Sequence, residues 1–326
     1  MEMDLGWLRQ SFADDGYICG MDVLLPVYLS LRLGKPLLVE GAPGVGKTEI
    51  AKVLARVLDT ELIRLQCYEG LDENKALYEW NYQRQLLRIQ LTQAAGTKDA
   101  EILESDLFSE EYLLMRPLLR AIRSPGRPVL LIDEVDKVDE AFEAFLFELL
   151  SDFQISIPEL GTIQAGEIPV VVLTSNSERD LSDGLKRRCI YLYIDFPTVE
   201  RELEIIRVKA PEVPALLAQE LARAMRFLRT ELELRKKPSI AETLDWARAL
   251  AALERDRLNE RLCADTASLF LKNRDDIQAL RREISNHGLT RMLSRGDETA
   301  PASSRRSPAA EPARYDVPPV GEPEPK

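Results

Sequence analysis

The sequence is poor in the residues that most often build metal sites and covalent catalytic sites. Its 326 residues include one histidine, His287, and four cysteines that form no C-x-x-C pair. A histidine-rich zinc site and an H-E-x-x-H helix both need more imidazoles than this. Because the cysteines are far apart, we expect free thiols in a reducing compartment, without a disulfide framework or a zinc knuckle. The four are Cys19, Cys67, Cys189 and Cys263.

An excess of positive charge and long apolar runs are also missing. The chain has 43 Lys+Arg against 55 Asp+Glu, a formal net charge of −12. Nucleic acid is therefore not expected as a general partner, because such binding depends on basic side chains that neutralise phosphates. No run approaches about 18 apolar residues, and no basic stretch precedes an apolar one at the N-terminus. We therefore expect no membrane span, no signal peptide and a cytoplasmic location.

Apolar runs of strand length alternate with helical patterns in the first 197 residues. Glycines follow the first run, and residues 48–58 then repeat apolar side chains at the spacing of one helical face. Five buried strands separated by helices predict a parallel α/β sheet with helices on both faces. The five runs are Pro36–Glu40, Glu61–Leu65, Pro128–Ile132, Pro169–Thr174 and Ile190–Ile194.

The rest of the chain divides into two further parts. From residue 198 to 294 the apolar residues keep helical spacing and strand patterns are absent, which predicts an all-helical lid after an α/β core over residues 1–197. Seven of the 19 prolines lie after Gly296 among Ala, Ser, Glu and Arg. Such a composition buries too little apolar surface to offset the entropy of ordering, so residues 295–326 predict a disordered tail.

A glycine-rich loop connects the first predicted strand to the first helical pattern. It fits the pattern G-x-x-x-x-G-K-[ST] at every fixed position, between a strand and an amphipathic helix. Glycines let backbone N–H groups curl around phosphate oxygens, and the following helix directs its positive end at the anion. The loop therefore predicts binding of a nucleoside triphosphate such as ATP, with Lys47 on the phosphates and Thr48 on Mg²⁺. The candidate nucleotide-binding residues are Gly41, Ala42, Pro43, Gly44, Val45, Gly46, Lys47, Thr48 and Glu49.

Polar side chains follow the third and fourth predicted strands. Asp133 and Glu134 come directly after an apolar strand, at the edge of a parallel sheet where ligands bind. Asp133 is the candidate ligand of Mg²⁺, and Glu134 is the candidate general base that polarises the attacking water. Asn176 follows the next strand and is the candidate side chain that orients this water.

Two arginines, Arg187 and Arg188, stand just before the fifth predicted strand. A guanidinium at this position can reach into the site of a neighbouring subunit and stabilise charge on the transferring phosphoryl group. Either arginine can play this part, and the sequence does not choose between them.

The order of these motifs resembles that of the AAA+ ATPases. The residues match Walker A at 41–48, Walker B at 129–134, sensor 1 at Asn176 and an arginine finger at Arg187 or Arg188. More narrowly the sequence is similar to the MoxR family. Two segments, Cys67–Asp72 and Tyr78–Gln85, resemble the subgroup that contains the CoxD chaperone of carbon monoxide dehydrogenase maturation.

This resemblance implies a particular assembly and role. It implies an ATP-driven homo-oligomer, usually a hexameric ring, with Mg²⁺ and ATP bound between subunits. It also implies a partner with a von Willebrand factor A domain, and a client metalloenzyme that is remodelled or receives its metal centre. Residues 67–117 are long enough for the insert that follows the second strand in this family, and residues 155–167 for a hairpin before sensor 1.

Two features leave alternatives open. The sensor 2 arginine of many AAA+ proteins has no counterpart in residues 236–243, where Lys237 is the candidate substitute. The aromatic residues Tyr78, Trp80 and Tyr82 alternate as in a strand, which would place them on one face that either grips a client or packs within the insert. Two other functions also remain as alternatives, a nucleic-acid-directed motor on the same core and a nucleotide-gated scaffold that hydrolyses ATP slowly.

Overall fold

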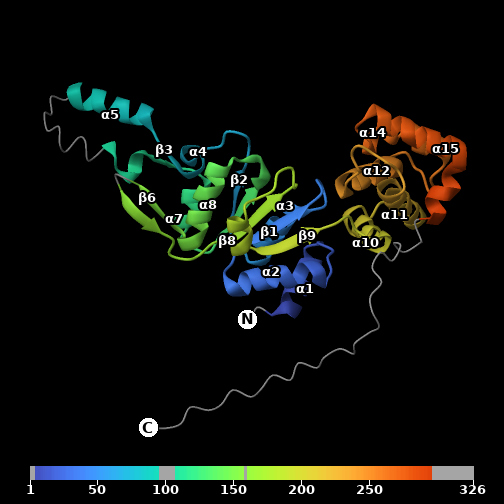
Figure 1. Ribbon diagram of the computed structural model, residues 1–326, viewed down its shortest axis with the longest axis horizontal. Coiled ribbons are helices and arrows are strands. Elements are labelled where there is room, and N and C mark those ends of the chain that lie inside the picture. Colours follow the sequence, from blue (N-terminus) through green and yellow to red (C-terminus); the bar gives the residue numbers. More distant parts are fainter. Residues whose placement is uncertain (1–3, 95–106, 158–159, 296–326) are drawn as a thin grey trace, which may run out of the picture.

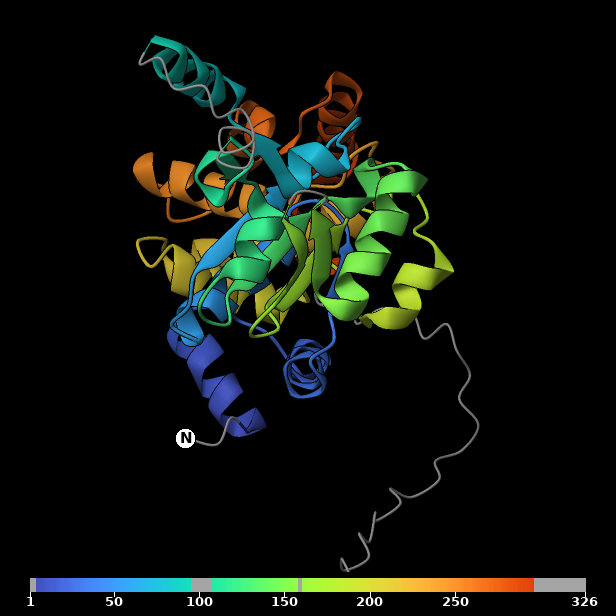
Figure 2. The same cartoon turned by 90° about the vertical axis from the view of Figure 1, so that its left-hand side faces the viewer.

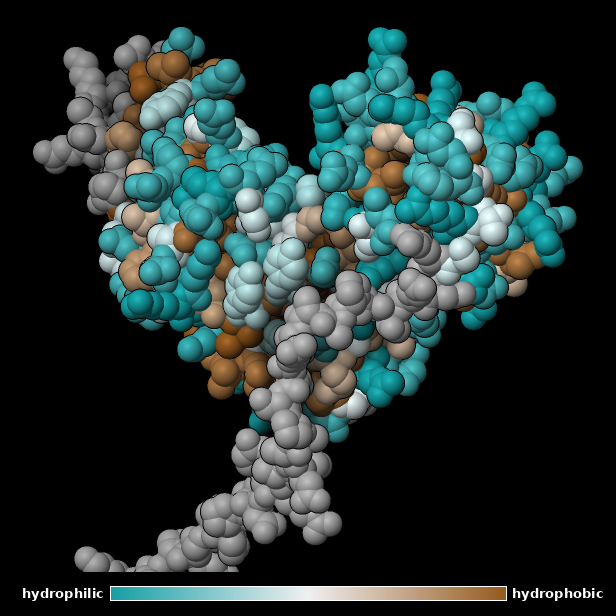
Figure 3. All heavy atoms as spheres, turned by 45° about the vertical axis from the view of Figure 1, so that its right-hand side comes forward, coloured by the Kyte–Doolittle hydropathy of each residue, from teal (hydrophilic) through white to brown (hydrophobic). Residues whose placement is uncertain are grey.

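The computed structural model describes residues 4–94, 107–157 and 160–295. They form an α/β lobe, up to residue 197, and a helical lobe that follows it (Figure 1). Figure 3 shows the two lobes as separate masses with a notch between them. The proline-rich segment 296–326, for which we predict disorder, lies outside the described residues.

The α/β lobe is built on a five-stranded parallel sheet, as the sequence predicts. Its strand order is β2-β5-β8-β1-β9. Strand β1 is therefore an inner strand, paired with β8 on one side and with β9 on the other. Each observed strand lies within one residue of its predicted bounds. The strands are β1 (Leu37–Gly41), β2 (Leu62–Gln66), β5 (Val129–Asp133), β8 (Val170–Ser175) and β9 (Ile190–Ile194).

Helices cover both faces of this sheet because its central strands are apolar on both sides (Figure 2). In β1, Leu37 and Val39 face one hydrophobic core and Leu38 faces the other. Helices of the first core are α1 (Leu5–Asp14), α2 (Met21–Leu33) and α3 (Lys47–Val57). Those of the second core are α7 (Pro117–Arg123) and α8 (Glu140–Asp152).

The segment between β2 and α7 forms a small substructure beside the sheet. Its two short strands pair antiparallel, and α5 extends away from the lobe (Figure 1). The described elements are α4 (Glu73–Leu77), β3 (Tyr78–Trp80), α5 (Tyr82–Ala94), the 3-10 turn η1 (Glu110–Tyr112) and β4 (Leu113–Met115).

The prediction that three aromatic residues share one strand face is wrong. The strand ends at Trp80, which is buried, and Tyr82 begins α5 with 61% of its surface exposed. The change of direction has a local cause, because the side chain of Asn81 accepts a hydrogen bond from the backbone N–H of Arg84 at 3.1 Å and so caps the helix. The rings of Tyr78 and Trp80 pack edge to face, with their centroids 6.1 Å apart.

Shorter elements complete the α/β lobe. Strands β6 (Gln154–Ile157) and β7 (Gly161–Gln164) pair antiparallel as a hairpin before β8. The 3-10 turn η2 (Val135–Lys137) follows β5, and α9 (Asp183–Arg188) leads into β9.

The second lobe is helical throughout its described residues, as predicted. It encloses its own hydrophobic core, in which Trp246 and Phe270 stack with ring centroids 4.1 Å apart. Helix α15 changes direction at Gly288, where φ is +68°. The helices are α10 (Val199–Lys209), α11 (Ala215–Thr230), α12 (Ile240–Ala252), α13 (Glu260–Asp265), α14 (Ala267–Phe270) and α15 (Arg274–Arg295). Within the described parts of both lobes, no helix has the length and apolar character needed to cross a bilayer.

Candidate nucleotide-binding site

The glycine-rich loop runs from the end of β1 to the start of α3. Gly44 and Gly46 have φ values of +76° and +97°, a region that other residues rarely adopt. Gly46 occupies the N-cap position of α3 with no side-chain cap, so the first N–H groups of the helix stay free for an anion. Among the remaining loop residues Val45 is buried, Ala42 is half-buried and Pro43 is exposed.

The side chain of Lys47 hydrogen-bonds to the backbone at the start of its own loop. Its Nζ donates to the backbone oxygens of Gly41 at 2.8 Å and Ala42 at 2.9 Å, and to Asn176 Oδ1 at 2.8 Å. Burial lowers the pKa of the Lys47 ammonium, and the nearby carboxylates, Asp136 foremost, act in the opposite direction. The structure thus joins the loop lysine to the asparagine at the end of β8, two residues 129 positions apart in the sequence.

Thr48 and Asp133 also meet, across the ends of α3 and β5. Thr48 Oγ1 donates to Asp133 Oδ1 at 3.1 Å, and the same carboxylate oxygen accepts from Thr174 Oγ1 at 2.5 Å. Asp133 is almost fully buried, at 3% exposure. A hydroxyl and a carboxylate beside a phosphate-binding loop are the hard oxygen donors that Mg²⁺ prefers, so the residues present fit this ion.

Glu134 is held from both sides in this conformation. Its Oε2 accepts from Gln66 Nε2 at 3.1 Å and from Lys137 Nζ at 2.6 Å, and its backbone N–H donates to Thr174 Oγ1 at 2.9 Å. Its backbone is left-handed, with a φ of +59°. Because both contacts fall on the same carboxylate oxygen, Glu134 must leave at least one of these partners before that oxygen can approach an attacking water.

Asp136 is a site residue that our sequence analysis does not identify. Its Oδ2 accepts from the backbone N–H groups of Asn176 at 3.0 Å and Glu178 at 2.9 Å, which fixes the turn after β8. Its Oδ1 is buried and has no hydrogen-bond partner among the described residues. Asp136 therefore places Asn176 within reach of Lys47.

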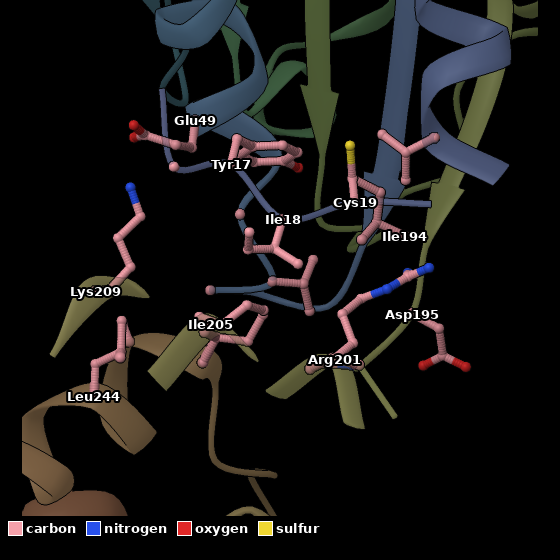
Figure 4. Close-up of a pocket in the computed structure, with 18 residues that line it drawn as sticks. Tyr17, Ile18, Cys19, Glu49, Ile194, Asp195, Arg201, Ile205, Lys209 and Leu244 are labelled. Carbon is pink, nitrogen blue, oxygen red and sulfur yellow. The ribbon is translucent and has the colours of Figure 1, made fainter. Parts of the chain in front are cut away.

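A cavity of about 390 Å³ lies next to the loop, between the two lobes (Figure 4). Glu49 lies on its wall, and the thiol of Cys19 lines it with a pKa raised to about 12 by burial. Its size is that of a small-molecule site. Apolar residues from both lobes line it, namely Ile18, Val45, Ile194, Ile205, Ile240 and Leu244. Two cationic side chains from α10, Arg201 and Lys209, also line it.

The helical lobe touches the loop at Ser239 instead of the lysine that the sequence suggests. A Cβ added at Gly44 would lie 2.4 Å from Ser239 Cβ, so the two backbones approach closely. Ser239 caps α12 through a reciprocal pair of hydrogen bonds with Glu242. Lys237 is exposed and does not line the cavity, so the structure does not place it as a substitute for a sensor 2 arginine.

This close approach predicts the effect of a single methyl group. Gly44→Ala forces a strained backbone and a contact with Ser239, so we expect nucleotide affinity to fall by about 1–3 kcal/mol in binding free energy. Ser239→Gly removes the contact but not the strain, and the double variant should recover part of the affinity. Titration with a fluorescent ADP analogue measures both, with Gly126→Ala as control, since a Cβ there meets nothing within 4 Å. A double variant no better than Gly44→Ala would rule out the contact with Ser239.

The two arginines before β9 lie apart from this site. Arg188 stacks its guanidinium over the Phe147 ring at 4.0 Å, whereas Arg187 is exposed and makes no hydrogen bond or ion pair within the described part of the chain. Neither lines the cavity beside the loop. The structure therefore brings the other candidate residues together, whereas Arg187 and Arg188, also among the described residues, make no contact with them.

Comparison with known proteins agrees with this geometry. Residues 36–189 match the AAA domain of the dynein-related subfamily. The chain is 23% identical over 271 residues to the gas vesicle ATPase GvpN of Haloferax mediterranei, and 21% identical over 270 residues to the gas vesicle ATPase GvpN1 of Halobacterium salinarum. Each match covers 78% of this chain and 74% of the relative. The solved Holliday junction branch migration motor RuvB of Thermotoga maritima is 21% identical, with a TM-score of 0.47 over 81% of this chain and 73% of RuvB.

Residues 36–189 therefore match an AAA domain of the dynein-related subfamily, and both relatives that cover most of the chain are named ATPases. The sequence-based predictions of an ATPase and of a five-stranded parallel α/β core followed by a helical lobe are confirmed.

Proposed function

We propose that this protein hydrolyses Mg²⁺-bound ATP between the subunits of a homo-oligomeric ring and uses the reaction to remodel a client protein. The proposal rests on hydrogen bonds that connect the loop after β1 to side chains at the C-terminal ends of β5 and β8. The Nζ of Lys47 bonds to Asn176 after β8, and the hydroxyl of Thr48 bonds to Asp133 at the end of β5. AAA ATPases typically work as oligomers, and the resemblance to the MoxR family implies a hexamer.

Each side chain has a role that follows from its place. Lys47 supplies positive charge to the phosphates, and Thr48 and Asp133 would hold Mg²⁺, which neutralises negative charge on the phosphates when bound. Glu134, once released by Gln66 or Lys137, accepts the proton of the attacking water. Asn176 orients that water, and its position is fixed through the backbone by Asp136.

The cavity supports a coupling between nucleotide and lobe movement. Its walls come from both lobes, with Ile18 and Ile194 on one side and Ile205 and Leu244 on the other. Binding or loss of a nucleotide there changes contacts that connect the lobes, so the helical lobe acts as a lid. Such a movement, passed around a ring, is the physical basis for work on a client.

Two variants test the ATPase part of the proposal. Lys47→Ala should weaken ATP binding by about tenfold or more, because it removes a charge-assisted contact to the phosphates. Glu134→Gln should bind ATP as the wild type does but hydrolyse it about 10²-fold more slowly, since the amide cannot accept a proton. The matched controls are Lys52→Ala, whose side chain is 45% exposed on the same helix as Lys47, and Glu148→Gln at an exposed position of α8. Wild-type hydrolysis rates in both site variants would overturn the proposal.

The client falls into one of two classes. The segments that resemble the CoxD subgroup support a metalloenzyme, such as a molybdenum hydroxylase, acted on together with a partner that carries a von Willebrand factor A domain. The names of the two relatives instead support a role in gas vesicles. Stimulation of the ATPase by the purified metalloenzyme and its partner, but not by gas vesicle proteins or by DNA, would support the first class. Stimulation by DNA at low salt would instead favour a nucleic-acid-directed motor.

A further inference from the structure

The side chain of Arg64 donates a hydrogen bond to one carboxylate oxygen of Asp133, the candidate Mg²⁺ ligand. Its Nη2 lies 2.5 Å from Asp133 Oδ2, and no role for Arg64 follows from the loop, the acidic pair or the trans-acting arginines. We propose that Arg64 is a displaceable cation that neutralises Asp133 until Mg²⁺ enters, so that it sets how much Mg²⁺ the site requires. This inference rests on the proposed Mg²⁺–ATP site.

The sheet places Arg64 where it can do this. Strands β2 and β5 are parallel neighbours, with Gln66 in register with Asp133 and Arg64 in register with Leu131. Residues two apart on a strand share a face, so the side chain of Arg64 runs alongside β5 toward the end of the strand, where Asp133 lies. The exposure of β2 alternates accordingly, because Ile63 and Leu65 are buried and Arg64 and Gln66, each one residue later, are exposed.

The two oxygens of Asp133 have different partners. Oδ1 accepts from the hydroxyl groups of Thr48 and Thr174, whereas Oδ2 accepts from Arg64. A carboxylate buried this deeply requires a compensating charge, and in this conformation the guanidinium supplies it. Mg²⁺ and a guanidinium repel each other and compete for the same negative charge, so the ion cannot bind Asp133 at full strength while Arg64 stays.

Arg64 is also held loosely enough to leave. Its side chain is 51% exposed against 5% for Asp133, and it contacts the carboxylate through one nitrogen and not as a two-nitrogen fork. Water can solvate the guanidinium as it withdraws. The same nitrogen donates to Gln66 Oε1 at 2.5 Å, and Gln66 in turn donates to Glu134. Withdrawal of Arg64 thus also removes a contact from the side chain that holds the candidate base.

The test compares the Mg²⁺ requirement of the full-length wild type and Arg64→Gln. A fluorescent ADP analogue at low concentration reports binding while buffered free Mg²⁺ is raised. We expect the Mg²⁺ concentration at half effect to fall about five- to tenfold in Arg64→Gln, because the competitor is gone. Affinity in EDTA should stay within about twofold of wild type, since in this proposal Arg64 binds Asp133 and not the nucleotide.

A second measurement needs neither nucleotide nor activity. With Arg64→Gln the buried carboxylate of Asp133 lacks its counter-charge, so Mg²⁺ alone should raise the melting temperature of the variant and leave that of the wild type nearly unchanged. Arg64→Lys, which keeps the charge, should behave like the wild type. The matched control is Arg120→Gln, because Arg120 pairs with Glu61 just before β2 and away from the site.

The outcomes separate the possible failures. An unchanged Mg²⁺ midpoint together with equal thermal responses would overturn the role of Arg64 and leave the ATPase proposal standing. A large loss of affinity in EDTA would make Arg64 a phosphate ligand and also overturn the proposal. Absence of nucleotide binding by the wild type would contradict the proposed function itself.

Discussion

Replacing Arg187 with alanine is expected to slow ATP hydrolysis by the assembled protein by about 10³-fold or more while leaving nucleotide affinity close to that of the wild type. Arg187 stands at the end of α9 with its side chain exposed, and it has no hydrogen bond or ion pair within the described parts of the chain. An arginine that stabilises transition-state charge in a neighbouring subunit has little effect on ground-state binding. Single-turnover hydrolysis and nucleotide titration separate the two quantities.

Arg188 is the matched control because it has the same chemistry one residue later. Its guanidinium already lies over Phe147 at 4.0 Å, a cation–π contact that stabilises the packing of α9 on α8. Arg188→Ala should therefore lower the melting temperature and reduce the hydrolysis rate by about tenfold or less. If Arg188→Ala lost activity as completely as we expect for Arg187→Ala, the assignment of roles would be reversed.

Mixed assemblies test whether Arg187 acts between subunits. Subunits with Arg187→Ala keep an intact loop, and subunits with Lys47→Ala keep an intact Arg187. Neither is active alone, but where the two meet in the right order one complete site forms. Partial recovery of hydrolysis on mixing is the expected result. No recovery at any ratio would contradict a trans-acting arginine.

The loop and the acidic pair could be predicted from the sequence because their chemistry is encoded locally. The residues from Gly41 to Thr48 have fixed spacing, and a buried strand followed by Asp133 and Glu134 carries its own context. Arg64 and Gln66 could not be found in this way. Their partners at the end of β5 and directly after it are 69 and 68 positions away, and the order of strands in a sheet is not contained in hydrophobic periodicity. Polar residues alternating within an otherwise apolar strand are the signal that could have identified them.

The cavity was missed for a related reason. Its wall joins Ile18, near the N-terminus, to Ile205 and Leu244 of the helical lobe, and this meeting depends on how the lobes are placed. No pattern within one lobe specifies that placement. The wrong assignment of Tyr82 to a strand, by contrast, could have been avoided from the sequence alone. Asn81 directly precedes a helical pattern, and asparagine is a common N-cap residue.

Removing Arg229 alone from its buried ion pair with Glu202 is expected to destabilise the helical lobe by about 3–5 kcal/mol. The pair is two-pronged, with Nη1–Oε2 at 2.6 Å and Nη2–Oε1 at 2.9 Å, and both side chains are at most 2% exposed. Arg229 also donates to the backbone oxygen of Pro238 at 2.7 Å, and its guanidinium lies over the ring of Phe196 at 4.8 Å. It thus ties α10 and α11 to the connection between the lobes.

The same pair positions the contact with the nucleotide loop. By holding Pro238, Arg229 fixes the residue before Ser239, which in turn lies against Gly44. Arg229→Met should therefore lower nucleotide affinity as well as stability, although Arg229 does not line the cavity. Both losses should appear together in urea denaturation and in nucleotide titration.

We expect Arg229→Met to lose stability because the carboxylate of Glu202 stays buried without a counter-ion, and not because packing is lost. Arg229→Met leaves the Glu202 carboxylate buried without a counter-ion, whereas Glu202→Leu with Arg229→Met removes both charges and should recover most of the stability. Trp246, buried in the same lobe, reports unfolding by fluorescence in a background where Trp7 and Trp80 are replaced by Phe. Arg248→Met breaks only exposed contacts, an ion pair with Glu212 and a hydrogen bond to the backbone oxygen of Lys209, and should cost about 1 kcal/mol or less. A double variant as unstable as Arg229→Met would show that the pair stabilises through its hydrogen bonds to Pro238 and Thr243, and would refute the assignment to uncompensated charge.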